Sequence, residues 1–156
     1  MRNSILRRLS VLLLVLLGCG APSQSQVEPR VLNGFVLQEK GGAFDQVIGS
    51  EEQFRTFVAA IPSTLPDKRR PDRPNPDPLR GDFRIDFSKQ VLVVAVHRDT
   101  LSAFPEYLGT SKEADGISVD FTIPEPPPEA RPYGWGVYTA VLLPKSEHPH
   151  RIVRKG

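Results

Sequence analysis

Residues 91–96 constrain the fold more than any other stretch, because six apolar residues follow one another without a polar interruption. Four of the six are valine, and β-branched residues favour strands over helices. The run is too short for a long helix, and its lack of alternation is typical of a strand covered on both faces. We therefore predict a central strand here.

Five other segments have strand patterns. Apolar residues alternate with polar ones in residues 117–123, which predicts an antiparallel strand with one face in water. Residues 31–37 are a first strand in which Gly34 weakens the pattern or marks a bulge, and Gly41 and Gly42 provide the turn after it. We also predict strands at 137–143 and 83–87, and a short edge strand at 151–153. Residues 86–89 could equally form a turn.

One helix is predicted from Ser50 to Pro62. Ser50 is a suitable N-cap, Gln53 stands at the capping-box position, and Pro62 ends the helix. Its apolar residues recur at helical spacing and form one stripe: Phe54, Phe57, Val58 and Ile61. Residues 31–156 therefore predict a single α+β domain, with a mostly antiparallel β-sheet, one main amphipathic helix and long proline-rich loops.

Residues 63–82 are rich in proline and charge, and we expect them to form an exposed loop that does not join the core. An alternative is a docking segment that engages an acidic partner through Lys68, Arg69 and Arg70. The prolines from Pro124 to Pro128 cannot pair inside a sheet.

The N-terminus has the order of an export signal. Arg2, Arg7 and Arg8 precede nine mainly apolar residues, 9–17. As a helix these nine would rise about 14 Å against a hydrocarbon core of about 30 Å, so they cannot span a membrane alone. The run closes on Leu16, Leu17, Gly18 and the only cysteine, Cys19.

These four residues resemble the lipobox of bacterial lipoproteins. The resemblance implies that residues 1–18 are removed, that the Cys19 thiol carries a diacylglycerol, and that its amine can be acylated. The alternative is an ordinary secretory signal that leaves Cys19 as a free thiol. Lipidation is favoured, because a lone exposed thiol is a liability in an oxidising compartment.

Residues 19–30 then form a flexible tether, whose final eleven residues reach about 18 Å root-mean-square. Gly20 stands where some Gram-negative lipoproteins carry the aspartate that retains them in the inner membrane. We therefore expect a protein of the bacterial envelope, bound to the membrane through lipid on Cys19, with the outer membrane favoured over the inner one in a Gram-negative organism.

The charge of the mature chain disfavours a nucleic-acid partner. The sequence has 20 basic and 18 acidic residues, but three of the bases lie in the signal. Without them 17 bases face 18 acids, a net charge of −1, whereas nucleic-acid binders carry positive charge on the folded domain. No second cysteine exists to form an intramolecular disulfide.

The sequence offers little for catalysis, and we expect neither an enzyme nor a cofactor. It lacks a Gly-x-Ser-x-Gly elbow, a phosphate-binding glycine loop and zinc-ligand spacing. Its histidines are His97, at the end of the central strand, and His148 and His150, which flank Pro149. The last two could face one metal ion, but no third ligand is evident and the default is an exposed turn.

An aromatic patch is the best candidate for partner contact. Tyr133, Trp135 and Tyr138 lie in six residues with two glycines, and exposed aromatic side chains are common interface anchors. The alternative is that Trp135 covers one end of the core.

The domain also resembles bacterial lipoproteins whose C-terminal domain belongs to the PrcB-like family, which is named for a component of a protease complex. The segments that carry the resemblance are residues 50–54, 86–94 and 137–145. It implies a non-enzymatic domain that binds and stabilises an envelope protease or another protein. We therefore expect a lipid-anchored protein that acts through protein contacts; the alternative is a lipoprotein that binds a small ligand or a metal.

Overall fold

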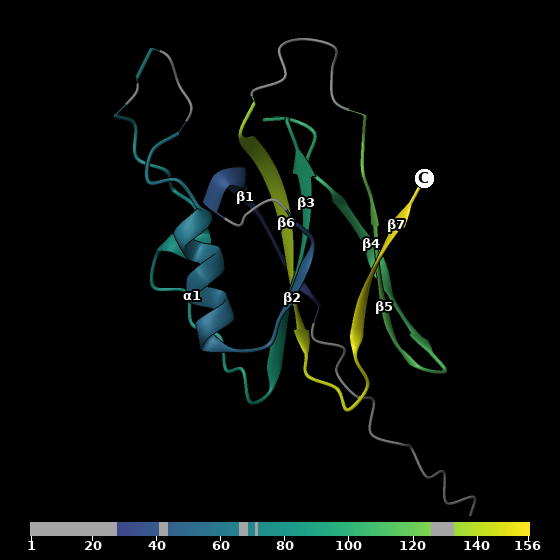
Figure 1. Ribbon diagram of the computed structural model, residues 1–156. Helices are drawn as coiled ribbons and strands as arrows, with labels where there is room; N and C mark the ends of the chain where they lie inside the picture. The colour runs from purple at the N-terminus through teal and green to yellow at the C-terminus, as the bar shows by residue number, and fades with distance from the viewer. Residues whose placement is uncertain (1–27, 41–43, 66–68, 71, 126–132) are drawn as a thin grey trace, which may run out of the picture.

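Two β-sheets lie face to face, and one helix covers the outer face of the larger sheet (Figure 1). The computed structural model describes residues 28–40, 44–65, 69–70, 72–125 and 133–156. The larger sheet contains β1 (Arg30–Leu37), β2 (Gln46–Ile48), β3 (Gln90–Arg98) and β6 (Trp135–Pro144). The smaller sheet contains β4 (Glu106–Glu113), β5 (Gly116–Thr122) and β7 (His150–Lys155). The helix is α1 (Glu51–Ala60), and short 3-10 turns occupy η1 (Gln38–Lys40) and η2 (Pro78–Arg80).

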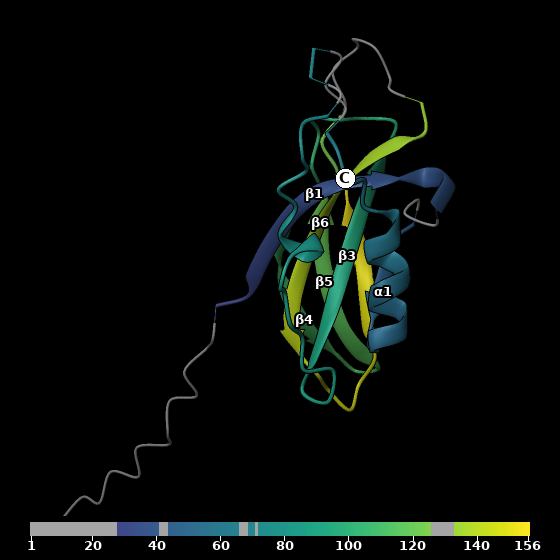
Figure 2. The same ribbon diagram turned by 90° about the vertical axis from the view of Figure 1, so that its left-hand side faces the viewer.

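The strand order is β1-β6-β3-β2 in the larger sheet and β4-β5-β7 in the smaller one. All pairs are antiparallel except β5 and β7, which are parallel. The α+β prediction for the domain is confirmed, and the tertiary structure adds that the strands form two layers (Figure 2).

The central strand is β3, as its apolar run predicts. Leu92, Val94 and Val96 pack beneath α1, while Val91, Val93 and Ala95 pack against the smaller sheet. A strand between two apolar layers needs no polar face, which explains why its sequence does not alternate.

The helix also begins and ends as predicted. The Ser50 hydroxyl accepts a hydrogen bond from the Gln53 amide, and the Gln53 side chain accepts one from the Gly49 amide. Phe54, Phe57 and Ile61 lie in the core between α1 and the larger sheet.

The strand predictions for 31–37, 117–123, 137–143 and 151–153 are confirmed with small shifts of their ends. In β5 the alternation places Val119 and Phe121 in the core between the sheets. The prediction for 83–87 is wrong. Phe83, Ile85 and Phe87 are half-buried at alternate positions, but the segment is a loop packed against the core beside α1 and ends in the turn foreseen near Asp86.

The expectation that residues 63–82 stay out of the core is wrong at one end of the segment. Asp77 and Leu79 are buried, with 6% and 2% of their surfaces exposed. Leu79 fills a gap in the core beside α1, and the Asp77 carboxylate has hydrogen-bond donors to replace water. Lys68, the Gly41–Gly42 turn and the prolines after Glu125 lie outside the described residues.

Candidate functional site

The predicted anchor lies outside the part of the chain that the structure describes. Residues 1–27, which include Cys19 and most of the expected tether, are not described. The described chain starts with exposed Glu28 and Pro29 and enters β1 at Arg30. None of the described helices is long and apolar enough to cross a bilayer.

The aromatic patch does not form one surface. Tyr133 is 94% exposed, Trp135 is half-buried at the start of β6, and Tyr138 is fully buried. The prediction that Tyr138 contacts a partner is therefore wrong, because its side chain points beneath α1 and its ring packs edge-on against Phe57 at 5.2 Å between centroids. Trp135 lines a hollow together with Leu37 and Ile61. Its role as an interface anchor or as a cover for one end of the core stays a prediction.

The histidines have ordinary surroundings. The His97 Nδ1 lies 2.8 Å from the Ala103 carbonyl oxygen, which fits a residue at the end of a strand. His148 is exposed, while burial lowers the pKa of half-buried His150 at the start of β7. Among the described residues, no three His, Cys, Asp or Glu side chains are grouped so as to hold a metal ion.

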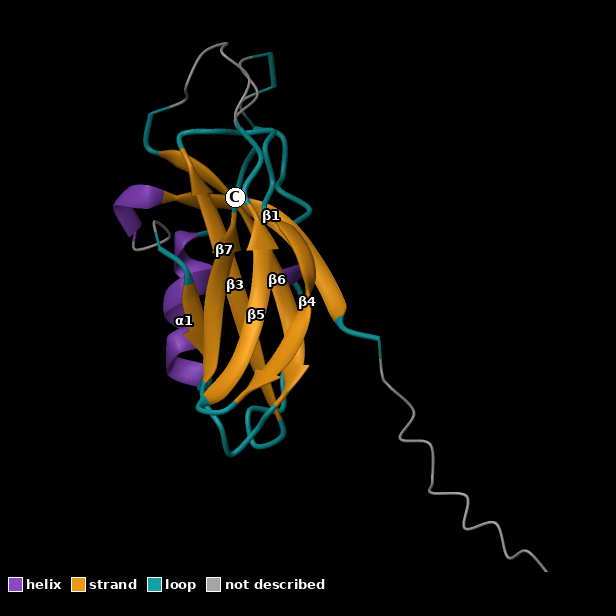
Figure 3. Cartoon of the chain, turned by 90° about the vertical axis from the view of Figure 1, so that its right-hand side faces the viewer, coloured by secondary structure: helices purple, strands orange, loops and turns teal. Residues whose placement is uncertain are grey.

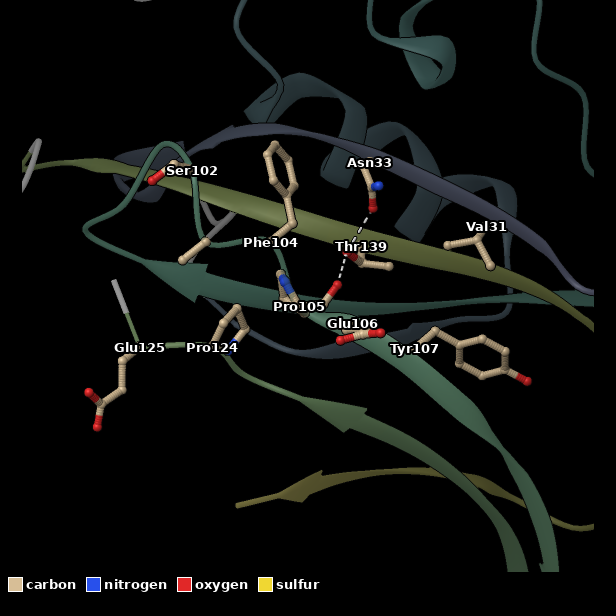
Figure 4. A pocket seen from close by; sticks show the side chains of 11 residues that line it. Val31, Asn33, Ser102, Phe104, Pro105, Glu106, Tyr107, Pro124, Glu125 and Thr139 are labelled. Atoms are coloured by element: carbon tan, nitrogen blue, oxygen red, sulfur yellow. Dashed lines mark hydrogen bonds between the residues drawn. The ribbon is translucent and has the colours of Figure 1, made fainter. Parts of the chain in front are cut away.

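A groove between the two sheets is a concave site that residues from both sheets line. It has a volume of about 610 Å³ and is open to solvent along one side. Figure 4 shows side chains from both sheets around it. β1 and β6 supply Val31, Asn33 and Thr139, and β4 and the loop before it supply the opposite wall. The residues of that wall are Ser102, Ala103, Phe104, Pro105, Glu106 and Tyr107, with Pro124 and Glu125 beyond β5.

The unequal width of the sheets creates this groove. Four strands face three, and the edge strands β1 and β4 lie on the same side of the molecule (Figures 2 and 3). At the opposite side β7 contacts β2 and closes the gap between the sheets. β1 is therefore left without full cover on its inner face, where Val31 is 44% exposed.

A hydrogen-bonded bridge fixes the shape of the groove. The Thr139 hydroxyl donates to the Pro105 carbonyl oxygen, and its oxygen lies 2.8 Å from Asn33 Oδ1 on β1. Phe35, from the same face of β1, packs edge-on against Phe104 at 5.8 Å between centroids. The bond of Pro105 to β6 and the packing of Phe104 on β1 hold the loop before β4 against the larger sheet, so the groove is preformed.

The groove has an acidic character. Among the described residues that line it, Glu106 and Glu125 are charged and both are exposed, whereas no lysine or arginine is present. Apolar side chains make up most of the remaining surface. Such a lining suits a ligand with apolar groups and a positive charge.

The most strongly perturbed ionisable pair lies elsewhere. The buried Tyr138 hydroxyl donates to both carboxylate oxygens of Asp77, at 2.7 and 2.8 Å, and the Leu79 amide donates to Oδ1 at 2.9 Å. Burial raises the pKa of Asp77, while these hydrogen bonds and the charge of Arg80 oppose the rise. Burial, together with the adjacent carboxylate, also raises the pKa of Tyr138. Neither residue lines the groove, so the pair acts in stability.

The sequence did not predict the groove. Its residues come from four separate segments, and nothing in the local pattern of β4 distinguishes an edge strand from a polar loop. The sequence feature that could have indicated the site is the apolar pair Phe104-Pro105, which stands between two polar segments.

Comparison with known proteins found no match among protein-family models, curated proteins or solved structures. The lipoprotein signal and the PrcB-like resemblance therefore stay predictions from the sequence.

Proposed function

We propose that this chain is a bacterial envelope lipoprotein that acts without catalysis, by binding another protein at the groove between β1 and β4. The observation that carries the proposal is the open, mainly apolar groove bordered by two edge strands. An open site beside the edges of two sheets suits a polypeptide segment, which can lie along the edge strands.

The short spacing between the expected lipid anchor and the groove supports a partner in the same envelope compartment. Val31 follows Cys19 by twelve residues. With a lipid on Cys19, the groove stands within about 20 Å of the bilayer for a flexible tether of this length. An envelope protease or a protein in complex with one is the class of partner that the PrcB-like resemblance implies.

The second candidate is a small-ligand-binding lipoprotein. Its support is the size of the groove, because about 610 Å³ falls in the range of small-molecule sites and polar groups from Asn33 and Thr139 converge in it. The open side argues against it, since small-molecule sites usually enclose most of their ligand.

The proposal is tested by photo-crosslinking in living cells. A photoreactive amino acid replaces Phe104 in the groove, or Arg151 on β7 at the opposite side as the matched control. We expect a discrete protein crosslink from position 104 and none from position 151. Absence of protein crosslinks from both positions, in cells that contain the folded protein, would contradict a protein-binding function.

A further inference from the structure

The hydrogen-bonding pattern of β1 determines which of its amides are available. The Gln38 amide donates to the Gly134 carbonyl at 3.0 Å, and the antiparallel register continues from there through β1. Because hydrogen-bonded pairs alternate along an antiparallel ladder, the even-numbered residues of β1 bond β6. The amide groups of Val31, Asn33 and Phe35 therefore point away from β6, toward the edge of the sheet.

Part of this edge is already occupied. The Phe35 amide donates to the Asp77 carboxylate, so the turn at η2 covers the edge at that point. Gly34 makes the approach possible, because a Cβ there would collide with the Asp77 carboxylate and lie 2.5 Å from the Tyr138 ring. Proteins commonly cover sheet edges with such loops. Within the part of the chain that the structure describes, no hydrogen bond reaches the Val31 or Asn33 amide, and both residues line the groove.

The other border of the groove is less suited to strand addition. β4 contains an irregularity in register between Tyr107 and Gly109, and its last two residues are Lys112 and Glu113. Bulges and charged side chains are the features that discourage pairing at an edge. The edge of β1 at Val31 and Asn33 has a regular register with β6 and carries no charged side chain at these two positions.

From this placement we infer that the partner contributes an extended segment that adds a fifth strand to the larger sheet at Val31 and Asn33, with a basic side chain over Glu106 and Glu125. The inference rests on the proposed function and specifies how the same groove is used. Main-chain hydrogen bonds to β1 provide affinity, and alternate side chains of the segment enter the groove. The two carboxylates select lysine or arginine there, because the described lining residues include no lysine or arginine that would pair with them.

The probe is a random peptide library displayed on phage, selected against the full-length chain purified from membranes in detergent. We expect enriched peptides with alternating apolar residues and one lysine or arginine. Hydrogen exchange, measured with the best peptide, is expected to slow at the Val31 and Asn33 amides and not along β4 or β7.

Two substitutions at one position separate the backbone from the side chain. Val31→Pro removes an amide that does not bond β6, so the strand keeps its ladder. We expect about tenfold weaker peptide binding, the effect of one lost hydrogen bond, and a smaller loss for Val31→Ala, which keeps the amide. A peptide N-methylated at the pairing residue tests the same bond with the protein unchanged, and we expect a similar loss even if Val31→Pro folds poorly.

Charge is tested with the double variant Glu106→Gln, Glu125→Gln. We expect weaker binding at low salt and a flatter salt dependence, whereas Glu113→Gln and Glu147→Gln outside the groove leave both unchanged.

Three results would overturn the inference. The first is peptide binding unaffected by Val31→Pro and by N-methylation. The second is a concentration-dependent dimer in sedimentation that Val31→Pro abolishes, which would assign the edge to a second copy. The third is a small molecule that binds the groove while no peptide does. A protein crosslink from position 104 together with any of these would preserve protein binding and reject only the added strand.

Discussion

Asp77 shows how a proline-rich, charged segment can contribute to a core. Its carboxylate is buried, yet it accepts hydrogen bonds from the Tyr138 hydroxyl and the Leu79 amide. The described residues contain no buried side-chain nitrogen or oxygen without a hydrogen-bond partner. Burial of the carboxylate is tolerated because these donors replace water, but its raised pKa means that the folded protein binds the proton more tightly than the unfolded chain does.

The raised pKa of Asp77 predicts a pH dependence of stability. The folded protein binds this proton more tightly than the unfolded chain, so the contribution of Asp77 is fully present below the ordinary pKa of aspartate. It is lost as the pH rises through the folded-state pKa. We expect urea unfolding at a series of pH values to show that the free energy of unfolding of the parent falls relative to that of Asp77→Asn. The fall occurs as the pH rises from the ordinary pKa of aspartate through the pKa of Asp77 in the folded protein. A constant difference between the two proteins would contradict the assignment.

Gly34 is the second residue-scale prediction. Any side chain there meets the Asp77 carboxylate and the Tyr138 ring. Gly34→Ala is expected to lower the free energy of unfolding by about 1 to 3 kcal/mol through overpacking. Gly49→Ala is the control, because the nearest atom to its added Cβ is the Gln53 side-chain oxygen at 4.0 Å. Equal free energies of unfolding for Gly34→Ala and Gly49→Ala in urea would contradict this prediction, because they would show that the turn at η2 can move to make room for the Cβ.

At the scale of elements, an arginine on β7 joins the two sheets. Arg154 donates to both carboxylate oxygens of Asp45, each at 2.8 Å, and to the Val96 carbonyl at 3.0 Å. Asp45 in turn accepts from the Val96 amide at 2.8 Å, which extends the short pairing of β2 with β3. The planar guanidinium suits this bidentate arrangement, and an ammonium cannot reproduce it.

Arg154→Lys is therefore expected to cost about 1 to 2 kcal/mol in the free energy of unfolding, although the positive charge is kept. The matched control is Arg151→Lys on the same strand, whose partner Asp115 is exposed. We expect less than about 0.5 kcal/mol for the control, as for other exposed ion pairs. Thermal and urea unfolding of both variants provide the measurement. Equal losses of unfolding free energy would show that the bidentate link between the sheets does not account for the effect of Arg154→Lys.

At the scale of the whole molecule, the anchor is the central prediction. Cys19→Ala removes the thiol that the lipobox resemblance assigns to lipid. We expect the parent in the membrane fraction with a lipidated mass, and the variant released from it or mislocalised, by fractionation and mass spectrometry. An unlipidated mature parent with the same fractionation as the variant would contradict the lipoprotein assignment. Gly18→Ala, which keeps a small residue before the cysteine, is expected to behave as the parent.

Much of the fold was predictable where local pattern and burial agree. The helix has its cap and its stripe in the sequence, and β3 has a continuous apolar run because it is covered twice. Residues 83–87 alternate as a strand does, yet they pack one face on the core without pairing. Alternation reports which side chains are buried and does not report hydrogen bonding, so it cannot separate these two cases.

The candidate site was less predictable, because its residues come together through strand pairing that local sequence patterns do not report. Tyr133, Trp135 and Tyr138 are close in sequence, but strand geometry buries Tyr138 completely while Tyr133 stays in solvent. β4 is polar enough to resemble a loop, and its role as one wall of the groove depends on pairing with β5.

The sequence by itself determined the α+β class, the central strand and the helix, because each depends on residues that are neighbours along the chain. The lipid anchor stays a prediction of the same local kind. Only the tertiary structure decided that the strands divide into layers of four and three, that Asp77 enters the core, and that a groove opens between β1 and β4. These features depend on contacts between residues far apart in sequence, such as Tyr138 with Asp77 and Thr139 with Asn33. Local periodicity carries no information on such pairings, since it reports burial and not the partner that provides it.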